Sequence, residues 1–155
     1  MRKNFGAKPY CYPQPVFIIG TYDDCGIPDA MTAAWGGISD DKEISMCISA
    51  GHKTTKNLLK RKAFTVSMAE EKYLDACDYV GITSANSVKD KFARAGFTAV
   101  KSEFVDAPLT EELSVAVECK LKSYDPSSGR LVGEIVNVSV DERVLDENGN
   151  VDTAK

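Results

Sequence analysis

Histidine and paired cysteines are scarce in this chain, which limits its metal and thiol chemistry. His52 is the only histidine, and no Cys-x-x-Cys pair occurs among the five scattered cysteines, Cys11, Cys25, Cys47, Cys77 and Cys119. A structural zinc site or a disulfide framework needs paired or closely spaced ligands, so neither is expected and no metal site is predicted. We expect reduced thiols that lie mostly in the core, as in proteins of a reducing compartment.

Long apolar runs and an excess of positive charge are also missing. No stretch approaches the ~20 apolar residues that cross a bilayer, and the first residues lack the apolar segment of a secretory signal. The 19 Lys and Arg are outnumbered by 23 Asp and Glu, which gives a formal charge of −4, whereas nucleic acid rewards clustered positive charge. The sequence therefore predicts a cytoplasmic protein with neither a membrane nor nucleic acid as a partner.

Side chains for acid–base or nucleophilic catalysis form no recognisable set. The Gly-x-Ser-x-Gly pattern of serine hydrolases is absent, and a Cys–His pair would have to recruit His52. No catalytic side chain is predicted, and any redox chemistry would have to come from a bound cofactor.

The overall amino-acid composition is typical of a globular domain. The chain has 155 residues, of which 43% are apolar and 27% charged, enough to bury roughly 70% of the unfolded surface. We expect one domain over residues 1–155. Because Pro9, Pro13 and Pro15 fix their φ angles, residues 1–15 are expected to form an extended arm laid against something else, and residues 146–155 a tail.

Extended segments dominate the remaining sequence. Runs of β-branched and aromatic residues predict strands at 16–22, 30–37, 43–49, 63–69, 114–124 and 131–140, with polar turns at 23–29, 38–42 and 125–129 and an extended segment at 97–105. Within 114–124 the alternation directs Val117 and Cys119 to one face and Glu118 and Lys120 to the other. Six or seven strands with few helices predict a mainly β fold, an antiparallel barrel that is closed or nearly closed, because closure removes exposed edges.

Three short helices are expected between the strands. Thr54 or Thr55 can cap a helix that ends at Lys62, and residues 71–80 also favour a helix. Residues 87–90 fit a capping box for a third helix at 88–95, and Gly96 suits the left-handed position after it.

Two segments have the composition of ligand-binding backbone. Residues 30–37 are unusually small, so they either pack tightly under a helix or let a flat ligand approach the backbone. Residues 49–55 leave a strand and open a helix, where free N–H groups, Lys53 and two threonine hydroxyl groups suit a phosphate. The alternative there is an ordinary threonine cap beside an exposed lysine. A third segment, 78–84, could line a pocket, although a connecting loop is the interpretation we favour.

These segments occur together in an order that resembles the flavin reductase-like proteins, with the flavoredoxin-like branch most similar. The resemblance covers residues 9–145 and is carried by the segments 15–21, 29–36, 43–49, 52–58, 63–67, 79–81 with Ser84, and 91–97. It implies an FMN-binding split barrel, usually a homodimer with the flavin near the subunit interface, and it favours the ligand interpretation of the first two segments.

Carried over residue by residue, the resemblance implies a noncovalent FMN site. Four residues would run beside the flavin ring with their backbone at its polar edge: Thr32, Ala33, Ala34 and Trp35. Six would hold the ribityl chain and phosphate: Ser49, Ala50, His52, Lys53, Thr54 and Thr55. Ser84 and Lys91 are expected at the rim of the site.

The function implied by this resemblance is oxidoreduction through the flavin, with NADH or NADPH as the electron donor. The alternative is a flavoredoxin-like electron-transfer protein that binds FMN, turns over little nicotinamide and receives its electrons from a redox protein. A third hypothesis is a structural relative that binds no flavin. In that case residues 30–37 only pack under a helix, and residues 49–55 only cap one.

Overall fold

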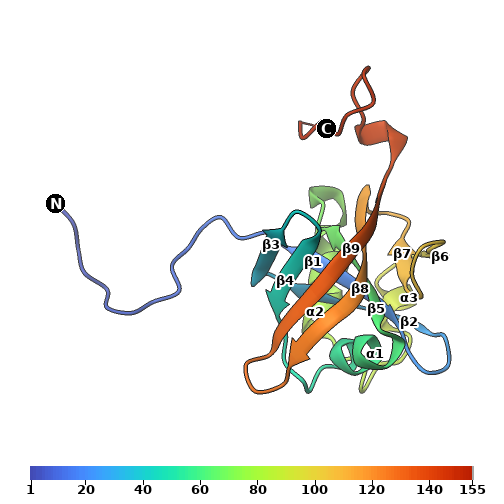
Figure 1. Ribbon diagram of the computed structural model, residues 1–155, viewed down its shortest axis with the longest axis horizontal. Coiled ribbons are helices and arrows are strands. Elements are labelled where there is room, and N and C mark those ends of the chain that lie inside the picture. The colour runs from blue at the N-terminus through green and yellow to red at the C-terminus, as the bar shows by residue number, and fades with distance from the viewer. Residues whose placement is uncertain (155) are drawn as a thin grey trace.

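The computed structural model of the chain describes residues 1–154 and is built around one antiparallel sheet of seven strands (Figure 1). In the order of the sheet, its strands are β2 (Pro28–Ala33), β1 (Phe17–Tyr22), β5 (Ala63–Met68), β8 (Val115–Asp125), β9 (Arg130–Val140), β4 (Glu43–Cys47) and β3 (Gly36–Asp40). A second, two-stranded sheet pairs β6 (Ala99–Lys101) with β7 (Pro108–Thr110). The helices are α1 (Lys53–Arg61), α2 (Leu74–Ile82) and α3 (Lys91–Arg94), with 3-10 turns at Glu71–Tyr73 and Glu142–Val144.

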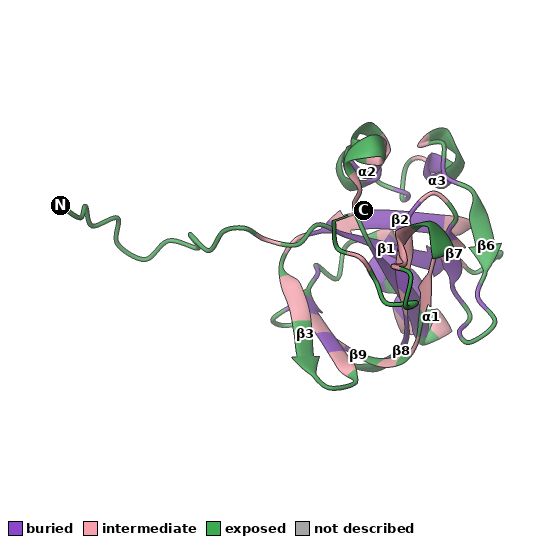
Figure 2. Cartoon of the chain, turned by 90° about the horizontal axis from the view of Figure 1, so that it is seen from above, coloured by how far each residue is buried: buried purple, intermediate pink, exposed green. Residues whose placement is uncertain are grey.

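The large sheet is curled into a half-barrel, as the sequence predicts. Strands β2 and β3 lie at its opposite edges, yet only Ala34 and Trp35 join them along the chain. The three Cα–Cα steps from Ala33 to Gly36 span about 11 Å at most, so the sheet has to curl until its edges approach each other, as the view from above shows (Figure 2). Cys47 is the last residue of β4, and its N–H donates to the carbonyl oxygen of Trp35 at 2.8 Å. This hydrogen bond fixes the link between β2 and β3. The prediction of a mainly β, antiparallel barrel with few helices is confirmed.

Alternation along β1 divides the core into two parts. Phe17 and Ile19 face the inside of the curl, where they join residues such as Phe64, Val66 and Leu131. Ile18 faces the other side and packs under α2 and α3 with a second cluster, Ala30, Cys77, Val80, Phe92, Phe97 and Leu113. The two helices therefore cover one face of the β1–β2 edge and form a wall beside it.

Several predicted boundaries are wrong. The expected strand 30–37 is two strands, because the chain turns from one sheet edge to the other at Ala34 and Trp35, and β3 replaces much of the expected turn at 38–42. The helix expected at 88–95 is only Lys91–Arg94, and no side chain caps it, so the capping box at 87–90 does not form. Helix α1 begins at Lys53 after His52, and neither threonine caps it.

Glu118 lies on the face opposite Val117 and Cys119, as the alternation predicts, but it is only 1% exposed. Its carboxylate accepts hydrogen bonds from Ser102, Asn137 and Ser139. The prediction that the cysteines lie mostly in the core is wrong. Only Cys77 and Cys119 are buried among the five cysteines. Burial raises the pKa of Cys77, and it raises the pKa of Cys119 to about 12, so both stay protonated thiols at neutral pH.

Both ends of the chain leave the sheet (Figure 1). Residues 1–13 are exposed and contain no helix or strand. In the tail, Leu145 bridges Val151 around a turn in which Asp146 accepts hydrogen bonds from the N–H groups of Asn148 and Asn150. The last residue of the predicted tail, 155, lies outside the described residues. Within 1–154, no helix has the length and apolar character needed to cross a membrane.

Close packing of β1 against β7 depends on the missing side chain of Gly20. A Cβ atom at Gly20 would lie 2.5 Å from Thr65 Oγ1 and 2.8 Å from the carbonyl oxygen of Pro108. We expect Gly20→Ala to lower the free energy of unfolding by about 1–3 kcal/mol, the usual cost of overpacking, as measured by urea denaturation. Gly37→Ala is the matched control, since a Cβ there meets nothing within 4 Å; equal stability of the two variants would contradict this packing.

Candidate functional site

A cavity of about 360 Å³ opens where β2, the start of α1 and the end of α2 meet. Its walls come from three separate segments of the chain, namely 31–35, 47–54 and 80–85, together with Lys91. The charged side chains among these lining residues are lysines, and none is Asp or Glu. The cavity is therefore suited to an anionic ligand.

The first wall is the free edge of the large sheet. Strand β2 pairs only with β1, so the outward N–H and C=O groups at its end are available to a ligand. The side chain of Thr32 does not compete for this space, because its hydroxyl group donates to the carbonyl oxygen of Cys77 on α2. The small side chains of Ala33 and Ala34 then leave the backbone accessible, while Trp35 stands 66% exposed at the mouth.

Helix α2 approaches this wall closely because of Gly81. A Cβ atom there would lie 2.9 Å from Thr32 Cβ, so a larger residue would separate the helix from β2. Residues 80–84 consequently line the cavity. The sequence-based preference for a connecting loop at 78–84 missed this, because the contact with β2 is made across a long separation in the chain.

The second wall is the N-terminus of α1, which provides donors for an anion. No side chain caps the helix, and its first turn contains no acidic residue. The amides of Lys53, Thr54 and Thr55 therefore remain open, and the helix dipole adds partial positive charge to that of the Lys53 side chain. Such an end is the usual place for a phosphate.

The two threonine hydroxyl groups, which the sequence offers as phosphate donors, have other acceptors. Thr54 Oγ1 donates to Asp29 Oδ2 at 2.6 Å, and Thr55 Oγ1 donates to the carbonyl oxygen of Ser49 at 2.8 Å. A phosphate oxygen needs a hydrogen-bond donor, and each hydroxyl has one hydrogen. Thr54 can serve the cavity only through its backbone N–H, and Thr55 does not line the cavity.

The loop that leads into α1 is held by the hairpin of β8 and β9. The N–H of Ile48 donates to the carbonyl oxygen of Gly129 at 2.9 Å, and Tyr124 Oη donates to the carbonyl oxygen of Ile48 at 3.0 Å. Ser49 and His52 follow directly and line the cavity, whereas Ala50 lines an adjoining hollow instead.

A buried polar network lies under the cavity and joins its walls. Asp29 and Lys91 are each 3% exposed, with 3.3 Å between Asp29 Oδ1 and Lys91 Nζ. Asn57 donates to Asp29 Oδ2 and to the hydroxyl oxygen of Thr21. Burial raises the pKa of the Asp29 carboxyl, and the hydrogen bond from Thr54 and the charge of Lys91 oppose that rise. Oδ1 of Asp29 accepts no well-aligned hydrogen bond, so its negative charge is compensated mainly by the ammonium group of Lys91.

Lys91 lies deeper than the rim position expected for it. Besides its ion pair, its ammonium group donates to the carbonyl oxygens of Val80 at 3.1 Å and Thr83 at 3.0 Å, at the C-terminal end of α2. With these three internal partners, Lys91 serves to hold the cavity-lining segment 80–85 in place rather than to reach for a ligand.

Ser84 lines the cavity and is exposed. Its Oγ accepts a hydrogen bond from the N–H of Asn86 at 3.2 Å, which leaves the hydroxyl hydrogen for a ligand. The side chain of Asn86 donates to the carbonyl oxygen of Gly51 at 3.2 Å and so ties this loop to the start of α1. Three further residues shape the site through partners that are distant in the chain: Asn86, Gly81 and Asp29. No local sequence pattern identified them as site residues.

Acid should loosen the hairpin turn that supports the second wall. Hydrogen bonds from Ser128 and Ser127 lower the pKa of Asp125 from 3.8 to about 2. The stabilisation from a lowered carboxyl pKa is present above pH 3.8 and is lost as the pH falls through about 2. We expect the Tm advantage of the wild type over Asp125→Ala to shrink across this interval; a constant difference would contradict the assignment.

Comparison with known proteins gives a consistent set of relatives. The sequence profile of the flavin reductase like domain matches residues 10–154. The solved structure of flavoredoxin from Desulfovibrio vulgaris (Miyazaki F) is 38% identical and superposes with a TM-score of 0.94, over 99% of this chain and 84% of that chain. Flavoredoxin from Methanosarcina acetivorans, 20% identical, shares the fold with a TM-score of 0.86 over 99% and 82% of the two chains. An uncharacterized protein of Aquifex aeolicus is 31% identical over 152 residues, 92% of this chain and 77% of its own.

Proposed function

The chain belongs to the flavin reductase-like domain family, and from that premise we propose that it binds FMN noncovalently and acts as an NAD(P)H-dependent flavin oxidoreductase. The observation that carries the proposal is that the uncapped N-terminus of α1, the side chain of Lys53 and the free edge of β2 all line one cavity. The reaction would take place in the cytoplasm, where reduced nicotinamides are available and the free cysteines stay reduced.

The residues of the cavity fit FMN at both of its ends. The phosphate would accept hydrogen bonds from the first-turn amides of α1 and a charge-assisted bond from Lys53, with Ser49 and His52 beside it. The flavin ring would lie along residues 32–35, where small side chains expose the end of β2. Ser84 would donate to the ligand from the opposite rim. The volume falls within the range of small-molecule sites, about 300–1,000 Å³.

The chain's own part in the reaction would be to bind and orient. When bound, FMN supplies the redox chemistry by accepting hydride and passing electrons on. Backbone donors at the end of β2 would stabilise negative charge at the polar edge of the ring, because fixed dipoles need no reorganisation. The α1 end would anchor the phosphate and so set the position of the ring. No side chain of the cavity needs to act as an acid or a base in this scheme.

A second candidate function is electron transfer without rapid nicotinamide turnover. It is favoured by the similarity to a flavoredoxin at 38% identity over nearly the whole chain. In this case a redox protein would supply or receive the electrons at the same FMN.

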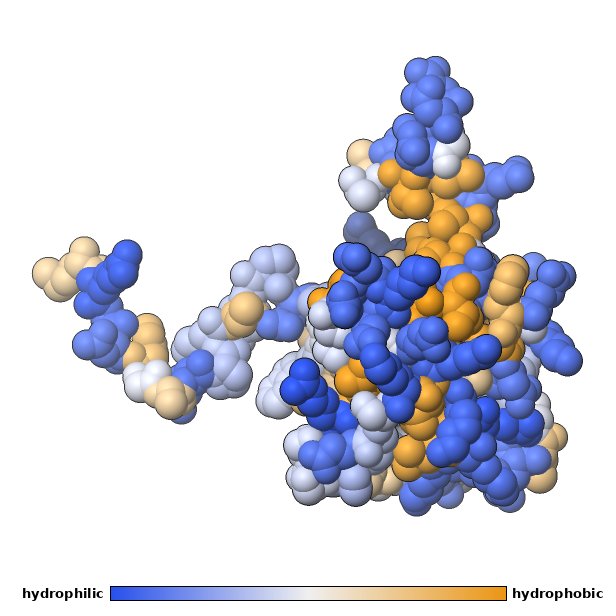
Figure 3. Space-filling view, in the orientation of Figure 1, coloured by the Kyte–Doolittle hydropathy of each residue, from blue (hydrophilic) through white to orange (hydrophobic). Residues whose placement is uncertain are grey.

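We also propose that the protein is a homodimer, because part of the inner face of the sheet lacks cover. Val66, Val117 and Val138 are aligned across β5, β8 and β9 on the face that packs into the core. At the β9 end this face opens, with Val138 48% and Val136 36% exposed, and apolar side chains gather along β9 in the space-filling view (Figure 3). A second copy would bury them. Analytical ultracentrifugation should give twice the chain mass; a monomer at micromolar concentration would refute the dimer.

Absorption spectroscopy tests the proposed cofactor and donor together. Purified protein should be yellow, with about one FMN per chain, and stripped protein should regain the spectrum on titration with FMN. Under anaerobic conditions NADH or NADPH should bleach it within seconds to minutes. Slow bleaching by both nicotinamides, with rapid bleaching by a reduced redox protein, would favour the carrier. Colourless protein that takes up no FMN would overturn both functions.

A further inference from the structure

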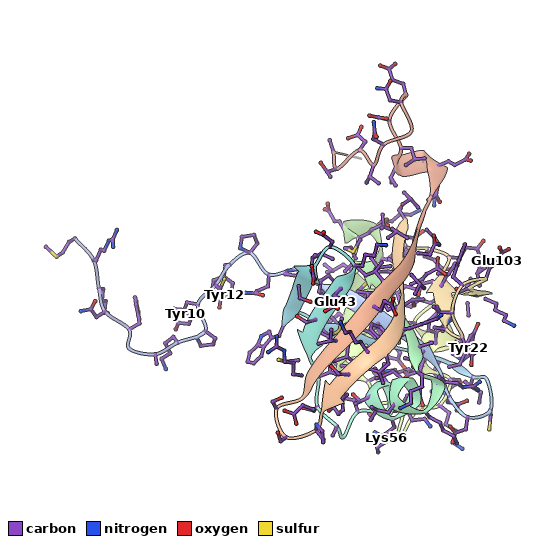
Figure 4. The ribbon with its side chains drawn as sticks, in the orientation of Figure 1. Tyr10, Tyr12, Tyr22, Glu43, Lys56 and Glu103 are labelled. Carbon is purple, nitrogen blue, oxygen red and sulfur yellow. The ribbon has the colours of Figure 1, made fainter. Side chains whose placement is uncertain are left out.

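The N-terminal arm, defined as residues 1–15, makes its hydrogen bonds and ring contacts within itself among the described residues. Phe5 and Tyr10 have ring centroids 5.8 Å apart, Tyr10 and Tyr12 are 6.3 Å apart, and Gln14 donates to the carbonyl oxygen of Cys11. The arm leads away from the sheet, and Tyr10 and Tyr12 lie on it far from the body (Figures 1 and 4). The three aromatic side chains are 58%, 60% and 78% exposed. This apolar area would be stabilised by a partner surface.

The arm is also suited to docking because it is stiff. Pro9, Pro13 and Pro15 each fix φ and bias the preceding residue to an extended conformation. A segment that is extended before binding loses less conformational entropy when it binds.

The exposed indole of Trp35 offers a matching surface. Three hollows meet at this side chain: the cavity described above, a hollow of about 320 Å³ toward residues 126–129, and one of about 350 Å³ toward Ile38 and Arg130. Ile38 is itself 68% exposed. Both outer hollows border the indole, and each has the volume to take an aromatic side chain.

The register of β1 and β2 brings the root of the arm to the same region. Phe17, the first residue of β1, lies opposite Ala33, the last residue of β2, and Trp35 follows two residues later. The arm therefore leaves the sheet at the end where the cavity opens. Across the sheet, Ile18 lies level with Ser67, Ala116 and Ser139, so the root of the arm lies at the same end of the sheet as the open face of β9. A second copy that covers this face about a two-fold axis can receive the arm at its own Trp35.

We propose that the arm of one copy lies across Trp35 of a second copy, where Tyr10 and Tyr12 fill the outer hollows and close the mouth of the cavity. The superposition with the Desulfovibrio vulgaris flavoredoxin includes most of the arm, since it covers 99% of this chain. An arm free in solution would have no fixed path to share with a relative, whereas an arm held by a second copy has one. The closing of an FMN site rests on the proposed function; the docking of the arm does not.

The chain supplies its own probe, because Trp35 is its only tryptophan. Acrylamide quenching of its fluorescence can be measured on the full chain, both as purified and freed of flavin. We expect weak quenching in the wild type and quenching that rises severalfold in Tyr10→Ser/Tyr12→Ser. Lys8→Ser, an exposed arm residue without a ring, is the matched control and should behave as the wild type.

A mixed dimer decides whether the arm acts on its own chain or on the other. Trp35→Phe, with an intact arm, is co-expressed with Tyr10→Ser/Tyr12→Ser under a second tag, so that the only tryptophan faces an intact arm of the partner. Protection of that tryptophan supports the proposal. Full exposure in the mixed dimer, strong quenching in the wild type, or a chain that remains monomeric would each overturn it. Because the flavin-free protein gives the same readout, failure of FMN binding is recognised separately.

Discussion

Replacing Lys91 by methionine is expected to lower the free energy of unfolding by about 3–5 kcal/mol, the usual effect of removing one partner of a buried ion pair. Lys91 and Asp29 are each 3% exposed, and the Oδ1 atom of Asp29 depends on Lys91 for compensation. The substitution also removes the donor for the carbonyl oxygens of Val80 and Thr83. Methionine has a similar length, so the loss reflects charge and hydrogen bonding rather than volume. Urea denaturation measures the effect.

Two further variants separate the buried charge from other causes. In Lys91→Met/Asp29→Asn no charge is left uncompensated, so this variant should regain part of the lost stability even though it carries an additional substitution. Lys89→Met changes an exposed lysine two residues away and should cost less than about 0.5 kcal/mol. If Lys91→Met loses under 1 kcal/mol, or if the double variant is less stable than the single one, the network does not hold the walls together.

Replacing Lys53 by glutamate is expected to weaken FMN binding by about a hundredfold or more. A hydrogen bond from a charged group contributes about 1.5–3 kcal/mol, and glutamate adds repulsion between its carboxylate and the phosphate. Lys53 lines the cavity at the first turn of α1, where there is no acidic residue at present. Fluorescence titration of stripped protein with FMN gives the dissociation constant.

The matched control is Lys56→Glu on the same helix. Lys56 is exposed on α1, its Nζ lies 3.4 Å from Asn86 Oδ1, and it does not line the cavity (Figure 4). Its effect on FMN binding should be no more than a few-fold, from screened charge alone. Riboflavin, which lacks the phosphate, should bind Lys53→Glu and wild type alike. An equal loss for riboflavin and FMN would mean that Lys53 contacts the ring end or only supports the fold.

The features that sequence analysis could predict are those whose signals are local. The small residues at 30–35 and the strand-to-helix transition at 49–54 each follow from a short window, and the structure brings both to one cavity together with Ser84 and Lys91. Their order along the chain also carried the family resemblance, which the profile match over residues 10–154 confirms. The predicted hairpin of the last two long strands is confirmed as well.

What could not be predicted depends on contacts between distant segments. Thr54 resembles a cap or a phosphate ligand, but Asp29, 25 residues away in the chain, takes its hydroxyl hydrogen. Glu118 alternates like a surface residue, but the loop after β6 covers it and Ser102 donates to its carboxylate. The strand expected at 30–37 breaks because the sheet curls and its two edges need a short link at Ala34 and Trp35. Each of these outcomes is decided by tertiary packing, which no short window of sequence contains.

The most direct test of the account is a crystal structure of the protein with FMN. We expect the phosphate within hydrogen-bond distance of the backbone N–H groups of Lys53 and Thr54, and the flavin ring along residues 32–35. A phosphate bound elsewhere, with the start of α1 left to water or to the protein's own side chains, would contradict the account.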